Sequence, residues 1–272
     1  MNRIDARFAA LRKEGQAAFI PYITAGDPTL DDTARYVLAL ERAGASVVEL
    51  GVPFSDPLAD GTVNQEAALR SLKGHVSLRN ILGMVKELRR DTEIPIVLFS
   101  YFNPVLAYGV EAFARDAAEA GVDGLLCVDL PLEETEAYGP ILHSAGLATV
   151  FLIAPTSPDD RVKRIAEASS GFIYYVSRTG VTGAQESVET AVKGMVAAIR
   201  RHTDKPVAVG FGISTPEQAR EVAAYADGVV VGSAIVRLIG ELGGGAEAAE
   251  KVAAFAAELA DGVRTSRRPM AT

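Results

Sequence analysis

The chain has 272 residues, with 27 Lys and Arg residues against 35 Asp and Glu residues and a formal net charge of -8. This length allows one large domain or two small ones, and an acidic balance without a basic stripe argues against a nucleic-acid-binding protein. No stretch approaches the ~18 apolar residues of a membrane span, and the N-terminal segment carries too many charges for a signal peptide, so we expect a cytoplasmic protein without membrane contact.

The N-terminal segment predicts a helix, because Ile4, Phe8 and Leu11 recur at helical spacing. We expect this helix to pack against the bottom of the fold. Eight short apolar runs rich in β-branched residues follow, at residues 17–25, 46–51, 94–100, 123–129, 148–154, 171–177, 205–212 and 227–233. Their hydrophobicity is nearly continuous rather than alternating, which is typical of parallel strands covered on both faces.

Amphipathic helical stretches alternate with these strands, at residues 30–44, 77–90, 110–121, 158–169 and 187–201. Eight strands alternating with helices in a chain near ~250 residues predict a single (β/α)8 TIM barrel of the α/β class. A doubly wound open sheet is the alternative. An extra helix is expected at residues 246–259, which gives one domain over residues 1–262 and a disordered tail over residues 263–272.

Polar residues at the strand ends are the active-site candidates, because catalytic side chains of such barrels gather at the carboxyl ends of the strands. They are Tyr22, Thr24, Asp27, Glu49, Asp56, Asp60, Tyr101, Asn103, Asp129, Tyr174, Tyr175, Ser177, Arg178 and Thr182. A Schiff-base mechanism lacks its lysine, since Lys205 stands at the start of its strand. His75, His143 and His202 lie in or beside helices, which disfavours a histidine-bound metal.

Carboxylate acid/base chemistry without a metal is what remains, with Mg²⁺ held by the acidic cluster as a lesser alternative. A buried, unpaired Glu49 would have a raised pKa, which suits proton transfer near neutrality. The plainer interpretation of Glu49 is a charge that reaches water or pairs with a cation, and Asp60 before Gly61 is by itself ordinary turn chemistry. Cys127 lies in an apolar run and is predicted to be a small buried side chain rather than a nucleophile.

Two glycine-containing segments follow the last two strands, at residues 210–214 and 232–236. Each leads toward a helix, so the backbone N–H groups of these two segments are available to bind an anion. Barrel enzymes place a phosphate at these two loops. We therefore expect a phosphorylated substrate, the alternative being glycines that only form tight turns.

The sequence resembles the α subunit of tryptophan synthase along essentially its whole length. The segments that carry the resemblance are PYITAGDP, ELGVPFSDPLADG, YFNPVLAYG, SRTGVTGA, GFGIS and GSAIV, in the order of the family. The resemblance implies retro-aldol cleavage of indole-3-glycerol phosphate to indole and glyceraldehyde 3-phosphate, without a cofactor in this chain. It also implies a role for Glu49 as general acid and base, and a role for Asp60 in holding the indole N–H and stabilising positive charge on the ring.

The resemblance further implies a phosphate site, an indole pocket and a lid. The phosphate would rest on Gly183, Gly212, Gly232 and Ser233, the pocket would be lined by Tyr22 and Tyr174, and the lid would carry Arg178 and Thr182. Tyr22 stands where the family often has Phe, and Thr62 stands where it commonly has Pro. These departures leave the catalytic residues in place.

The family pairs this subunit with a β subunit that carries pyridoxal phosphate, in an α2β2 heterotetramer. The matching contact surface includes residues 53–57, Asn103 and Pro104. Three alternatives stay open: a stand-alone indole-releasing lyase, a different sugar-phosphate isomerase or epimerase barrel, and a non-catalytic interaction subunit. The presence of both Glu49 and Asp60 argues against the last of these.

Overall fold

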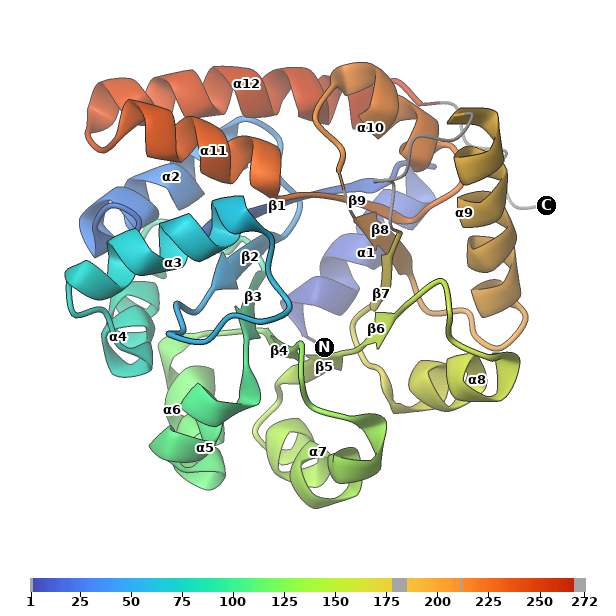
Figure 1. Ribbon diagram of the computed structural model, residues 1–272, viewed down its shortest axis with the longest axis horizontal. Helices are drawn as coiled ribbons and strands as arrows, with labels where there is room; N and C mark the ends of the chain where they lie inside the picture. Colours follow the sequence, from blue (N-terminus) through green and yellow to red (C-terminus); the bar gives the residue numbers. More distant parts are fainter. Residues whose placement is uncertain (1, 178–184, 211, 267–272) are drawn as a thin grey trace.

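The computed structural model describes residues 2–177, 185–210 and 212–266, and these form a parallel barrel surrounded by helices (Figure 1). The strands are β1 Ala18–Thr24, β2 Val48–Gly51, β3 Ile96–Ser100, β4 Gly124–Cys127, β5 Ala148–Val150, β6 Leu152–Ile153, β7 Ile173–Val176, β8 Val207–Gly210 and β9 Gly228–Val231. The α-helices are α1 Arg3–Lys13, α2 Leu30–Arg42, α3 Thr62–Lys73, α4 Leu78–Leu88, α5 Phe102–Tyr108, α6 Val110–Ala120, α7 Thr135–Ser144, α8 Asp159–Ala168, α9 Gln185–Arg200, α10 Pro216–Ala223, α11 Ser233–Leu242 and α12 Ala246–Arg264, with a short 3-10 turn at Leu132–Glu134.

The sheet closes at the fifth predicted strand. Its strand order is β5-β4-β3-β2-β1-β9-β8-β7-β6, so the first and last members are separated in sequence only by Phe151. The Ser170 N–H donates to the Thr149 carbonyl at 2.8 Å, and the Tyr174 N–H donates to the Phe151 carbonyl at 3.1 Å. The predicted eight-unit barrel is therefore confirmed, with one strand interrupted at Phe151, and the open-sheet alternative is wrong.

Helix α1 covers the bottom of the barrel, as its periodicity predicts. Ile4, Phe8 and Leu11 are buried, and they belong to one cluster with Ala18, Ile20 and other residues that fill the barrel interior. Figure 1 shows α1 in the middle of the ring of strands. One end of the barrel is thus closed by apolar packing, and the opposite end, where the strands finish, carries the polar residues.

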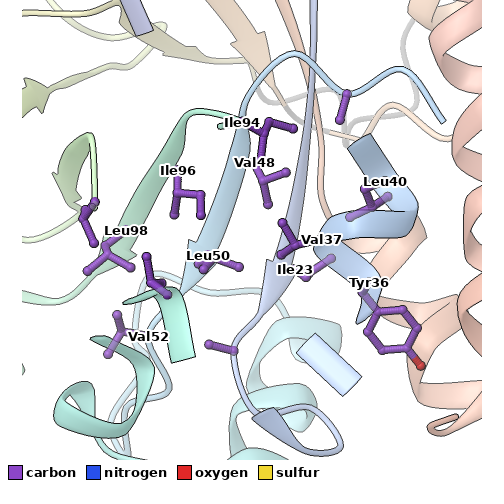
Figure 2. Packing of buried hydrophobic residues seen from close by; sticks show 14 of the residues in the cluster. Ile23, Tyr36, Val37, Leu40, Val48, Leu50, Val52, Ile94, Ile96 and Leu98 are labelled. Atoms are coloured by element: carbon purple, nitrogen blue, oxygen red, sulfur yellow. The ribbon is translucent and has the colours of Figure 1, made fainter. Parts of the chain in front are cut away.

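The outer face of the strands packs against the surrounding helices. Val48 and Leu50 on β2 lie in the same apolar layer as Val37 and Leu40 on α2 (Figure 2), and all four side chains are fully buried. Because successive side chains of a strand point to opposite faces, Glu49 between these two residues faces the barrel interior. The alternation along this one strand positions the candidate acid.

Two helices at the carboxyl ends of the strands, α3 and α5, are not among the helical stretches that the sequence predicts. Helix α3 begins directly after the loop that carries Asp60, and α5 begins directly after Tyr101 at the end of β3. The Asp129 carboxylate after β4 accepts a hydrogen bond from the Phe102 N–H at 2.7 Å, which satisfies a free amide at the start of α5. Both helices fix the loops on which candidate site residues stand.

The last helix is longer than the sequence suggests. Helix α12 continues to Arg264 rather than ending at residue 259, and Val263 is only 3% exposed. Residues 263 and 264, which the sequence places in the tail, therefore belong to the packed helix, because Val263 completes its buried face. The segment 267–272 lies outside the described residues.

Candidate functional site

Glu49 is a buried carboxylic acid inside the barrel. It is 0% exposed and lies in register with Tyr22 on β1 and Val97 on β3. Neither carboxylate oxygen has a hydrogen-bond partner among the described residues. Burial disfavours the charged form and raises the Glu49 pKa from 4.5 to about 8. Burial of the whole side chain, with no cation paired to it among the described residues, argues against the plainer interpretation of Glu49.

Asp60 lies on the loop between β2 and α3, partly buried above the barrel. Its Oδ2 accepts a hydrogen bond from the Tyr101 hydroxyl at 3.2 Å, and the same hydroxyl accepts one from the Ala59 N–H at 2.9 Å. Burial raises the Asp60 pKa, while the hydrogen bonds from Tyr101 and Asn64 lower it. Asp60 is therefore more than a turn residue, because its side chain is held by another element.

Tyr22, Tyr174 and Phe99 form an aromatic wall next to the two carboxyl groups. The Tyr22 and Phe99 rings meet edge to face, with centroids 5.2 Å apart. Burial raises the pKa of Tyr22, and the charges of Asp60 and Glu49 raise it further. Burial also raises the pKa of Tyr174, with a further contribution from the charge of Glu49. The structure thus brings together Glu49, Asp60, Tyr22 and Tyr174, which the sequence names as separate candidates.

Two glycines make room for the tyrosines. A Cβ added at Gly51 would lie 2.6 Å from Tyr22 Cζ, and one added at Gly210 would lie 2.7 Å from Tyr174 Cζ. Each glycine sits on the strand next to its tyrosine, β2 beside β1 and β8 beside β7. Any larger side chain at either position would displace the aromatic wall.

The candidate phosphate glycines lie at the ends of β8 and β9. Gly212 has a φ of 72°, a conformation that favours glycine. Gly232 is the N-cap of α11, and Ser233 is the first residue of that helix and is exposed. A Cβ at Gly232 would lie 3.5 Å from the Tyr22 Cβ, so the start of α11 adjoins the aromatic wall.

Three predicted site residues cannot be placed. Gly183, Arg178 and Thr182 lie outside the described residues. Their roles in a phosphate site and a lid therefore remain predictions.

Tyr101 and Asn64 were not assigned a role from the sequence. Tyr101 was noted only as a polar strand-end residue, although it hydrogen-bonds Asp60. Asn64 lies in the first turn of α3, directly after the loop that carries Asp60, and its side chain hydrogen-bonds Asp60. Its buried Oδ1 has no hydrogen-bond partner among the described residues. The closeness of Asn64 to Asp60 in the sequence is the available signal for Asn64, whereas no local pattern links Tyr101 to Asp60.

Other reactive groups lie away from these residues or are inert. Lys205 donates to the Ala166 carbonyl at 2.7 Å, at the opposite end of its strand. Cys127 is buried, and burial raises its pKa. No group of three or more His, Cys, Asp or Glu side chains suited to a metal occurs in the part of the chain that the structure describes. Over those same residues, no helix is both long and apolar enough to cross a membrane.

The fold and the site together define a (β/α)8-barrel protein with a buried acid, a second carboxylate and an aromatic wall at the carboxyl ends of the strands. Residues 8–264 match the family described as the tryptophan synthase alpha chain. The chain belongs to this family. Because the family is one of lyases, the chain is a lyase of tryptophan biosynthesis.

Individual relatives agree over nearly the whole chain. The tryptophan synthase alpha chain of Geotalea uraniireducens is 50% identical over 264 residues, covering 97% of this chain and 98% of the relative. A crystal structure of tryptophan synthase subunit alpha from Legionella pneumophila superposes with a TM-score of 0.89 at 36% identity, covering 97% of this chain and 98% of that one. A structure of tryptophan synthase from M. tuberculosis in an aminoacrylate-bound form superposes with a TM-score of 0.87 at 36% identity, covering 97% of this chain and 100% of that one.

Proposed function

We propose that this chain cleaves indole-3-glycerol phosphate to indole and glyceraldehyde 3-phosphate by a retro-aldol reaction. Membership of the tryptophan synthase alpha chain family supports the reaction. The observation that carries the mechanism is Glu49, which is fully buried, faces the barrel interior and has no hydrogen-bond partner among the described residues. A side chain in this state exchanges protons near neutral pH.

Glu49 acts as acid and then as base. With a pKa of about 8 it is protonated at neutral pH, so it gives its proton to C3 of the indole ring and makes the ring positively charged. The resulting carboxylate takes the proton of the side-chain hydroxyl next to the bond that breaks. The O–H electrons form the aldehyde, and the electrons of the broken carbon–carbon bond return to the ring, which becomes neutral indole.

Asp60 accepts the indole N–H and stabilises the positive charge that develops on the ring. Its hydrogen bond from Tyr101 supports this role, because it favours the ionised carboxylate that the charge requires. Tyr22 and Tyr174 contact the faces and edge of the indole. Their position beside Glu49 supports a ring site next to the proton donor.

The substrate phosphate binds at the start of α11. Gly232 and Ser233 supply N–H groups at the N-terminus of that helix, where an anion is stabilised. Gly212 contributes from the loop after β8, and Gly183 completes the site. Arg178 and Thr182 belong to a lid that excludes water during the reaction.

The chain carries no cofactor of its own and works in the cytoplasm with a β subunit that holds pyridoxal phosphate, in an α2β2 heterotetramer. Two exposed apolar side chains support docking of such a partner. Leu58 on the Asp60 loop is 94% exposed and Leu106 on α5 is 53% exposed. We call Leu58 and Leu106, together with residues 53–57, Asn103 and Pro104, the docking surface.

The experiment that tests the function measures indole release from indole-3-glycerol phosphate in the presence of EDTA, first by the chain alone and then with a tryptophan synthase β subunit. Weak release that rises with the β subunit is expected. Full activity of the chain alone would instead favour a stand-alone lyase. No release in either condition would overturn the proposal and favour a different sugar-phosphate barrel.

A further inference from the structure

Tyr101 lies between the Asp60 loop and the end of β3. It is 6% exposed, and its ring packs against Phe54 of the loop with centroids 5.1 Å apart. Its hydroxyl accepts from the Ala59 N–H at 2.9 Å and donates to Asp60 Oδ2 at 3.2 Å. One side chain therefore holds the loop at three neighbouring points: a ring, a backbone amide and the functional carboxylate.

The other contacts of the loop are mostly hydrogen bonds within the loop itself and from the adjoining helix α3. The Asp60 N–H donates to the Pro57 carbonyl at 3.1 Å, and Gln65 at the start of α3 donates to the Asp60 carbonyl at 2.9 Å. Ser55, Asp56 and Leu58 are exposed. These contacts fix the shape of the loop, whereas the contacts of Tyr101 fix where the loop stands relative to the barrel.

The groups that face Asp60 make the Tyr101 hydrogen bond electrostatically important. Tyr101 and Asn64 from α3 hydrogen-bond Asp60, and Tyr22 on β1 lies close enough to interact with the charges of both Asp60 and Glu49. No cation lowers the Asp60 pKa among these described groups. The ionised carboxylate is therefore stabilised by neutral hydrogen-bond donors, of which the Tyr101 hydroxyl is one.

Tyr101 also links Asp60 to α5. Tyr101 is the N-cap of that helix. The N–H of the following residue, Phe102, donates to the Asp129 carboxylate at 2.7 Å, and the Phe102 ring packs against Tyr138 with centroids 4.7 Å apart. Leu106 of the docking surface lies one turn further along α5. Tyr101 thus joins the start of α5 to the Asp60 carboxylate.

We propose that Tyr101 is a positioning residue that holds the Asp60 carboxylate in its working place and keeps it ionised. This proposal rests on the proposed function, which gives Asp60 the role of accepting the indole N–H. The hydroxyl contributes orientation and charge stabilisation, and the ring contributes a fixed support for the loop.

The test compares Tyr101→Phe with Tyr108→Phe. Tyr101→Phe removes the hydroxyl and keeps the ring against Phe54. Tyr108, at the other end of α5, is a matched control, because its hydroxyl also donates to a carboxylate, Asp116, at 2.7 Å. For each protein, the Asp60 pKa is measured by carbon-13 NMR titration, with the signal assigned by its loss in Asp60→Asn. The pH dependence of kcat/KM for indole release is measured alongside.

In Tyr101→Phe we expect kcat/KM to fall about ten- to a hundredfold, as for loss of a hydrogen bond to a charged group. The Asp60 pKa should rise, and the acid limb of the pH profile should move to higher pH by the same amount. Tyr108→Phe should change neither quantity. A purely structural role would lower stability without moving the Asp60 pKa.

An Asp60 pKa that is equal in the wild type and Tyr101→Phe would overturn the proposal, as would an equal shift in Tyr108→Phe. The two proposals fail in different ways. If the wild-type chain releases no indole, the proposed function is wrong, and the NMR titration still decides whether Tyr101 stabilises the Asp60 carboxylate.

Discussion

The ring of Tyr22 on β1 fills the space beside Gly51 on β2, so that a Cβ at position 51 would lie 2.6 Å from Tyr22 Cζ and 2.9 Å from Cε2. The Phe99 ring packs against the Tyr22 ring with centroids 5.2 Å apart, which leaves Tyr22 little freedom to move. We expect Gly51→Ala to displace the ring, to lower indole release more than tenfold and to destabilise the fold by about 1–3 kcal/mol. Urea denaturation and the indole assay check both effects.

The control for this prediction is Gly83→Ala, since no atom lies within 4 Å of a Cβ added there on the exposed side of α4. This change should stabilise the protein by about 0.5–1 kcal/mol, as expected for replacing glycine within a helix. In a Tyr22→Ala background the clash is absent, so Gly51→Ala should reduce the free energy of unfolding less than it does in the wild type. If Gly51→Ala is as stable and active as the wild type, the close contact is not a constraint.

Glu49→Gln should abolish nearly all activity and change how stability depends on pH. The Glu49 pKa is raised to about 8 in the folded chain, so the unfolded state binds fewer protons between about pH 4.5 and 8. Stability from this group is therefore fully present below pH 4.5 and is lost as the pH rises toward 8. Glu49→Gln should gain stability relative to the wild type across this window, by at most about 5 kcal/mol.

Urea denaturation of both proteins at several pH values measures that difference. The fixed cost of burying the amide shifts the difference by a constant and does not affect its slope. A difference that stays flat from pH 4.5 to 8 would show that Glu49 titrates normally. Retention of more than about a tenth of the activity by Glu49→Gln would contradict its role as acid and base.

Arg70 on α3 should be important for stability through Asp27 after β1. Its guanidinium makes two hydrogen bonds to the Asp27 carboxylate at 2.8 Å each, and Asp27 is only 2% exposed. Arg70→Met leaves this carboxylate buried and unpaired, so we expect a loss of about 3 kcal/mol in denaturant unfolding. Adding Asp27→Asn to Arg70→Met should recover part of the loss.

The matched control is Arg42→Met, which breaks an ion pair with Glu250 whose side chains are 61% and 72% exposed. Such a surface pair contributes little, and its loss should change stability by less than about 1 kcal/mol. Equal effects of Arg42→Met and Arg70→Met would contradict the importance of burial at Asp27.

The docking surface predicts which apolar residues matter for a β subunit. Leu106→Asp and Leu58→Asp place a charge on the surface that we expect the partner to cover, so affinity should fall at least about tenfold in isothermal titration calorimetry. Leu69→Asp is the control, because Leu69 is similarly exposed, at 55%, but lies on α3 outside the docking surface. Loss of affinity in Leu69→Asp alone would place the partner on a different face.

Local patterns in the sequence predict the barrel and part of the site. The spacing of Ile4, Phe8 and Leu11 predicts the helix that closes the bottom of the barrel, and the apolar residues on both sides of Glu49 explain why that side chain faces inward. The break at Phe151 depends on pairing with two different neighbours, β4 and β7, which no local pattern encodes. The Tyr101–Asp60 contact likewise joins residues 41 positions apart.

The closure of the sheet at Phe151 also limits how this protein can associate. Because the two ends of the sheet meet across a single residue, the described strands leave no lateral edge at which the strand of another molecule can add by backbone pairing. Partners are limited to helices and loops, where side chains rather than main-chain ladders determine recognition. A barrel closed in this way combines protection from strand-mediated aggregation with specific contacts at its rim.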